Sequence, residues 1–182
     1  MQSMNAQPDP TAILQTAFVF WSSKVLLTAV GFDVFTKLGN RRVTGAELGA
    51  EVGLNPRGIS DFFDALVAMK FLNREGDGKT AKYFNSTESA LYLDRASPRY
   101  IGGILVMLND RLFKFWHDLP EALRTGKPQN EVKHGQKGIF EALYEELPKL
   151  EQFLGAMTGL SLQTLKHSRR SSIFHGSRRC AM

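Results

Sequence analysis

A series of helix-start and turn signals between residues 44 and 86 constrains the fold more than any other feature of this sequence. Thr44 to Glu47 (TGAE) has the pattern of a capping box. In this motif the threonine side chain caps the first turn of a helix, and the glutamate side chain accepts a hydrogen bond from the threonine backbone amide. Asn55-Pro56 is typical of the start of a second helix. Two strand-like runs follow, FLNRE and AKYFNS, joined by GDGK. This order predicts a mainly α fold: a winged helix-turn-helix with a small β-hairpin.

Additional helices at both ends complete the predicted fold. Apolar residues recur at helical spacing from about Thr11 to Ala29 and extend around more than one side of the helix. Such a helix is either a core helix or an oligomer-interface helix. Periodicity alone leaves both possibilities open for this helix. Polar residues at 15 and 22–24 interrupt the apolar run and argue against a membrane span.

The C-terminal half also has a helical pattern. Ser97-Pro98 precedes a long helical stretch, RYIGGILVMLNDRLFKFWHDL. Gly102 and Gly103 lie inside it, where we expect an aromatic ring or another backbone to pack closely. A short helix from Pro120 to Gly126, a polar loop and two further helices, GIFEALYEEL and KLEQFLGAMTGLSLQTL, are predicted after it.

The distribution of charge argues against DNA binding. The chain carries 23 basic and 18 acidic residues, but five of the basic residues lie in the last seventeen positions, so residues 1–165 are neutral overall. Residues 44–70, the helix-turn-helix, have two basic and four acidic side chains. Asp61 and Asp64 lie on the would-be recognition helix, where a groove-binding protein needs Arg, Asn or Gln. A winged-helix transcription regulator remains an alternative.

The sequence offers no convincing reaction centre. The four histidines lack the spacing of a metal site, and no nucleophile-elbow, phosphate-loop or dinucleotide-binding motif occurs. Cys180 is the single cysteine, which excludes an intrachain disulfide. We therefore predict no catalytic, cofactor-binding or metal-ligating residue. The N-terminus lacks the pattern of a signal peptide, and we expect a cytoplasmic protein.

Four stretches taken together resemble the N-terminal dimerisation domain of S-adenosylmethionine-dependent O-methyltransferases of the caffeate and polyketide-tailoring type. In chain order they are SKVLLTAVGFDVFTKLG, VTGAELGAEVGLNPRGISDFFDALVAMKFLNREG, YFNSTESALYL and LYEELPKLEQFLGAMTGLS. The resemblance covers roughly residues 11–163. It implies a homodimer formed through the N-terminal helices and a lid over the pocket of a small aromatic substrate. We expect this homodimer to bury the face formed by Phe18, Trp21 and Val25. By position in the motifs, the candidate pocket residues are Phe113, Trp116, Phe140, Phe153 and Met157.

The resemblance ends near residue 165. In the family, a strand and a glycine-rich turn that holds S-adenosylmethionine follow the AMTGLS-type helix, and the 182 residues contain neither. We expect four segments: a disordered start (1–10), a winged-helix dimerisation domain (11–95), a helical substrate-lid and linker (96–165) and an aberrant basic tail (166–182). The expected function is a dimerisation and substrate-lid module that is inactive alone and has no cofactor of its own. A non-catalytic partner or inhibitor of a full-length methyltransferase is a further alternative.

Overall fold

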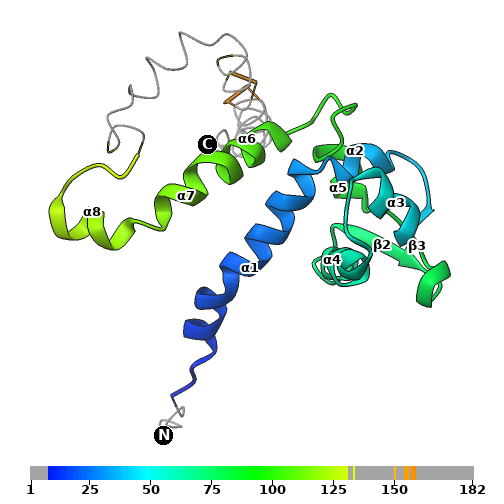
Figure 1. Cartoon of the computed structure of the whole chain (residues 1–182), viewed down its shortest axis with the longest axis horizontal. Helices are drawn as coiled ribbons and strands as arrows, with labels where there is room; N and C mark the ends of the chain where they lie inside the picture. Colours follow the sequence, from blue (N-terminus) through cyan, green and yellow to red (C-terminus); the bar gives the residue numbers. More distant parts are fainter. Residues whose placement is uncertain (1–7, 131–132, 134–149, 151–153, 156, 159–182) are drawn as a thin grey trace, which may run out of the picture.

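The computed structural model describes residues 8–130, 133, 150, 154–155 and 157–158. The structure is mainly helical with a small three-stranded sheet, which confirms the predicted fold class (Figure 1). The helices are α1 (Thr11–Gly31), α2 (Val34–Leu38), α3 (Gly45–Glu51), α4 (Ile59–Ala68), α5 (Thr87–Tyr92), α6 (Gly102–Met107), α7 (Phe113–Trp116) and α8 (Leu119–Thr125). The strands are β1 (Val43–Thr44), β2 (Leu72–Glu75) and β3 (Lys82–Asn85).

The predicted hairpin is present as β2 and β3. These strands pair antiparallel, from Leu72 opposite Asn85 to Glu75 opposite Lys82, and a short 3₁₀ turn (Gly78–Thr80) lies between them. The sheet has a third strand, β1, which pairs with β3 and gives the order β1-β3-β2. The sequence analysis did not predict β1, because a strand of two residues is too short to show an alternating pattern.

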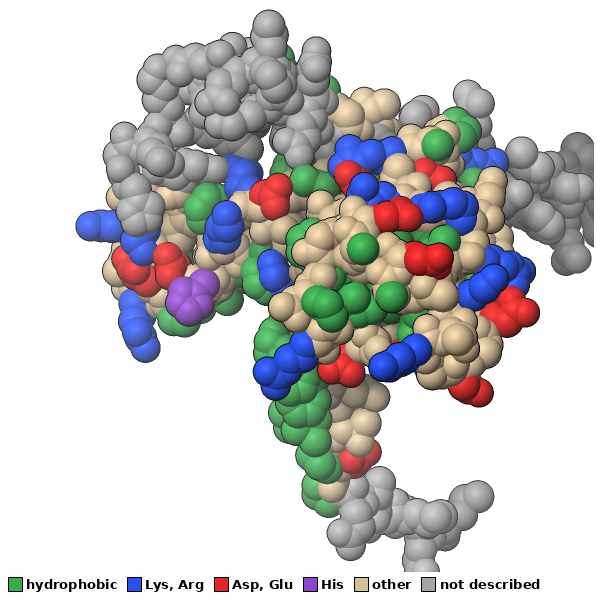
Figure 2. Space-filling model, turned by 45° about the vertical axis from the view of Figure 1, so that its right-hand side comes forward, with side chains coloured by type: hydrophobic (Ala, Val, Ile, Leu, Met, Phe, Trp, Pro, Cys, Tyr) green, Lys and Arg blue, Asp and Glu red, His purple; other side chains and the backbone are tan. Residues whose placement is uncertain are grey.

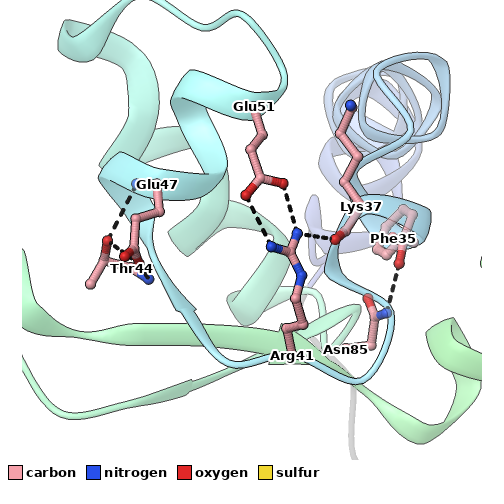
Figure 3. Close-up of polar contacts among 7 residues, drawn as sticks. All are labelled: Phe35, Lys37, Arg41, Thr44, Glu47, Glu51 and Asn85. Atoms are coloured by element: carbon pink, nitrogen blue, oxygen red, sulfur yellow. Dashed lines mark hydrogen bonds and ion pairs between the residues drawn. The ribbon is translucent and has the colours of Figure 1, made fainter.

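Local hydrogen bonds begin the helices where the sequence indicated. The Thr44 amide donates to Glu47 Oε2 at 2.8 Å and the Glu47 amide donates to Thr44 Oγ1 at 3.3 Å, so the predicted capping box is formed (Figure 3). Asn55 Oδ1 accepts a hydrogen bond from the Arg57 amide, as expected of a cap. However, Pro56–Gly58 form a 3₁₀ turn, and α4 itself begins at Ile59.

The core lies between the C-terminal end of α1 and the residues just after α5. It buries side chains from α1, α2, α3, α4 and both strands of the hairpin, and its members are Ala29, Val30, Val34, Phe35, Leu38, Leu48, Phe63, Leu66, Leu72, Tyr83 and Leu93. Polar contacts hold the connections around it (Figure 3). Arg41 pairs with Glu51 at 2.7 Å, and the side-chain amide of Asn85 donates to the carbonyl oxygen of Phe35 at 2.8 Å.

Two helical segments extend away from this core. The N-terminal half of α1 projects from it in one direction, and the run from α6 to α8 leads away in another (Figure 1). The two segments meet where α1 packs against α6 and the π-helical turn that follows it, Leu108–Leu112 (labelled η3). Near the start of α6, the ring of Tyr100 lies so close to Gly102 that a side chain there would overlap it. This packing is the close aromatic approach expected at Gly102.

Candidate functional site

The N-terminal half of α1 is an apolar surface that the described part of the chain leaves uncovered. Residues 11–22 are all exposed, and none of them is charged. Phe18 is 46% exposed and Trp21 57% exposed, and their rings stack with centroids 4.9 Å apart. Hydrophobic side chains cover much of this projecting helix (Figure 2). Exposed apolar surface of this extent marks an interaction site in a folded protein.

The exposure of α1 changes along its length. Val25 is half-buried and packs against the core of its own chain, and Leu27, Ala29 and Val30 are buried. Of the three residues predicted for a dimer interface, Phe18 and Trp21 therefore lie on the bare half, and Val25 lies where α1 enters the core.

The length and composition of α1 also meet the criterion for a membrane-spanning helix. Thr11–Gly31 is long and apolar enough to cross a membrane, with a mean hydropathy of 1.5 in its most apolar window. Core helices and signal sequences satisfy the same criterion, so length and composition do not discriminate between these possibilities.

A pocket of about 160 Å³ lies between α7, α8 and the segment that follows them, and it is open to solvent. Its walls are almost entirely apolar and are formed by Phe115, Trp116, Leu119, Ala122 and Gln129. Gln129 Oε1 is buried and, within the described part of the chain, accepts no hydrogen bond. Aromatic side chains such as Phe115 and Trp116 present flat apolar faces on which another ring can stack.

The predicted pocket residues have different positions in the structure. Trp116 lines the pocket and is 67% exposed. Phe113 does not line it; its ring instead lies 4.8 Å from the ammonium group of Lys24. Met157 is exposed, and Phe140 and Phe153 lie outside the described residues.

Four pocket residues were not predicted from the sequence: Phe115, Leu119, Ala122 and Gln129. Phe115 and Leu119 are four residues apart in the predicted helix, so their shared face was a usable signal. Gln129 lies in a polar loop, where no pattern distinguishes it from its neighbours.

One acidic side chain of the helix-turn-helix, that of Asp64, makes its contacts within the chain. The Tyr83 hydroxyl donates to Asp64 Oδ1 at 2.8 Å, and Arg74 Nη1 lies 3.2 Å from Asp64 Oδ2. Burial, together with this hydrogen bond, raises the pKa of Tyr83 to about 12. Asp64 therefore joins α4 to the hairpin, whereas a DNA-binding helix would present a hydrogen-bond donor to the groove. Across the described residues, no three His, Cys, Asp or Glu side chains form a cluster that could hold a metal ion.

Comparison with known families assigns a family to most of the N-terminal half of the chain. The sequence profile of the family described as O-methyltransferase dimerisation domain matches residues 14–95. This range includes most of α1, the complete helix-turn-helix and the hairpin.

Individual relatives match beyond this range. The tetracenomycin polyketide synthesis 8-O-methyl transferase TcmO of Streptomyces glaucescens is 40% identical over 152 residues, which cover 84% of this chain and 43% of that enzyme. Acetylserotonin O-methyltransferase of Gallus gallus is 30% identical over 164 residues, covering 88% of this chain and 47% of that enzyme.

Solved structures show the same architecture. The human N-acetylserotonin methyltransferase, determined in complex with SAM, superposes with a TM-score of 0.75 at 25% identity. The match covers 87% of this chain and 47% of the human chain. The present chain thus spans less than half the length of these relatives, and it corresponds to their N-terminal part.

Proposed function

This chain belongs, through residues 14–95, to the O-methyltransferase dimerisation domains, and we propose that it forms a homodimer through the exposed half of α1 and provides part of a substrate pocket. The enzyme that such a module serves would transfer a methyl group from S-adenosylmethionine to a hydroxyl of a small aromatic or polyketide-type molecule. The relatives named above support this substrate class, because their names specify O-methylation in polyketide synthesis and of acetylserotonin.

The observation that carries the proposal is the uncovered, uncharged half of α1. At 3.6 residues per turn, Ile13, Phe18 and Trp21 fall within an arc of roughly 140°. Fully burying side chains of this size stabilises a protein by roughly 1.5–3 kcal/mol each. A single chain that leaves several of them in water lacks this stabilisation. A second copy supplies the missing apolar partner, and a twofold arrangement covers both copies at once.

The dimer is tested by placing a charge on the exposed face. We expect the wild-type chain to have a mass near twice its 20.4 kDa in light scattering. Phe18→Glu and Trp21→Glu should each dissociate the dimer, since each would bury an unpaired carboxylate. Gln15→Glu adds the same charge to the same helix at a polar exposed position and should remain dimeric.

Two results would contradict this proposal. The first is a wild-type chain that remains a 20.4 kDa monomer at tens of micromolar, a concentration far above the Kd of stable dimers. The second is flotation of the wild-type chain, but not of Trp21→Glu, with phosphatidylcholine vesicles, which would assign α1 to a lipid surface.

The pocket on α7 and α8 supports the substrate class. Its rings can stack on a flat aromatic molecule, and its walls are almost entirely apolar. We expect 1-naphthol to bind in saturation-transfer NMR, and Trp116→Ala to weaken binding roughly tenfold through lost stacking and burial. Leu123→Ala removes an exposed side chain of α8 that does not line the pocket and serves as the control. Equal binding by both variants would exclude this pocket as the site.

A further inference from the structure

Lys24 is the one charged residue of α1, and its side chain contacts the helix that leads to the pocket. Its ammonium group donates a hydrogen bond to Asn109 Oδ1 at 2.7 Å and lies 4.8 Å from the centre of the Phe113 ring. The first contact joins residues 85 positions apart in the sequence. A charged group placed against an amide oxygen and an aromatic face makes favourable electrostatic contacts with both.

The Asn109 amide is held in the orientation that this contact requires. Its Nδ2 donates to Asp110 Oδ1 at 3.0 Å, which leaves Oδ1 to accept from Lys24. Lysine can only donate and a carboxylate can only accept, so the two neighbours together fix which way the amide group points.

The two groups that Lys24 contacts lie at a π-helical turn. Asn109 is inside the turn Leu108–Leu112, and Phe113 is the first residue after it. Backbone angles remain helical through Met107, Leu112 and Phe113, so α6, the turn and α7 form one continuous helix. A π-turn accommodates one extra residue and so rotates everything after it by roughly 100° relative to a regular α-helix.

This rotation of the helix after the π-turn sets the positions of the pocket residues on α7. Phe115 and Trp116 follow Phe113 by two and three residues and form one wall of the pocket. On α1, Phe20 and Ile13 lie one and three turns before Lys24 on the same face, so the bare apolar surface leads directly to the Lys24 contact. Lys24 therefore lies between the self-association surface and the pocket.

We infer that Lys24 is a positioning residue: by holding the π-turn it couples the orientation of the Trp116 pocket to α1. The inference rests on the proposed function in so far as α1 is the self-association helix and the pocket binds a ligand. A second copy that immobilises α1 would then also immobilise the pocket wall, and a ligand in the pocket would favour the same arrangement.

The contact is tested by hydrogen exchange of the peptide that covers residues 108–116. Lys24→Met keeps the length of the side chain but removes the donor and the charge. We expect it to speed exchange in this peptide at least roughly tenfold. The exchange rate of residues 59–72 should stay unchanged, because only the π-turn loses its contact with Lys24. Lys24→Arg can still donate to Asn109 and stack on Phe113, so it should restore slow exchange.

Two further variants separate this role from a general effect of charge. Lys114→Met removes a lysine from α7 itself and should leave exchange unchanged. Asn109→Ala should reproduce part of the Lys24→Met effect, because it removes the hydrogen bond and leaves the contact with Phe113. The double variant should be no faster than Lys24→Met alone, because Lys24→Met already removes the hydrogen bond to Asn109. In saturation-transfer NMR, Lys24→Met should also weaken 1-naphthol binding.

Unchanged exchange in Lys24→Met, or a double variant whose effects add, would overturn the inference. Light scattering of each variant keeps this result distinct from the proposed function. A monomeric wild type would contradict self-association, whereas a dimeric Lys24→Met with wild-type exchange would contradict the positioning role alone.

Discussion

At the scale of single residues, the half-buried contact between Tyr83 and Asp64 gives the folded chain a dependence on alkaline pH. Burial and the hydrogen bond to Asp64 raise the pKa of Tyr83 to about 12, above its ordinary value of 10.0. The folded chain therefore keeps this proton at a pH where the unfolded chain releases it. The resulting stabilisation is complete below pH 10 and is lost as the pH rises from 10 to about 12.

Tyr83→Phe should remove this dependence. The variant loses one hydrogen bond, so we expect its free energy of unfolding at pH 8 to fall by about 1 kcal/mol. The difference between wild type and variant should then shrink between pH 10 and 12. Urea denaturation at pH 8, 10 and 11 measures both effects, with Tyr92→Phe, at a half-buried tyrosine, as the control. A constant difference across this range would show that Tyr83 does not titrate as described.

The contacts of single residues differ in how far the sequence could predict them. The capping box joins Thr44 to Glu47, three positions apart, so the local pattern was sufficient. Asp64 meets Tyr83 at a separation of 19 positions, and no local pattern encodes that contact. The charges of the helix-turn-helix argued against DNA binding, and the structure adds the contact that Asp64 makes instead.

At the scale of elements, the capping box decides where α3 begins. Thr44→Ala removes the side-chain oxygen that accepts the Glu47 amide and should lower the free energy of unfolding by about 1 kcal/mol. Thr44→Ser keeps the hydroxyl and should remain close to wild type. Thermal unfolding followed by circular dichroism measures both variants, and equal losses would mean that the methyl group of Thr44, and not its hydroxyl, stabilises this turn.

The π-turn, like β1, was not predicted from the sequence. The stretch RYIGGILVMLNDRLFKFWHDL (99–119) has apolar side chains at helical spacing, so its pattern predicted one long helix. The structure instead begins α6 at Gly102, ends α7 at Trp116 and places the π-turn between them. The widened turn lies at the contact with α1, where Lys24 meets Asn109, and this partner is distant in the sequence. Phe113 was a pocket candidate by its position in the family motifs, and Phe115 lines the pocket in its place.

At the scale of the whole molecule, the fold separates a core from two extended helical segments (Figure 1). The pattern of α1 left both a core helix and an interface helix open, because either kind of helix can have apolar residues on more than one side. The structure divides the helix: residues near Val30 belong to the core, and residues 11–22 are bare. Periodicity could not place this division, since it depends on where the other elements end.

The bare half of α1 also has a consequence for the fate of the chain inside a cell. An unassembled copy displays Phe18, Trp21 and their neighbours as an uncharged aromatic segment, the kind of surface that chaperones and proteases engage. In the proposed homodimer, pairing would hide that segment, so assembly and protection from turnover would become the same event. The abundance of the protein would then rise more steeply than its rate of synthesis, because unpaired copies would be removed and paired copies would persist.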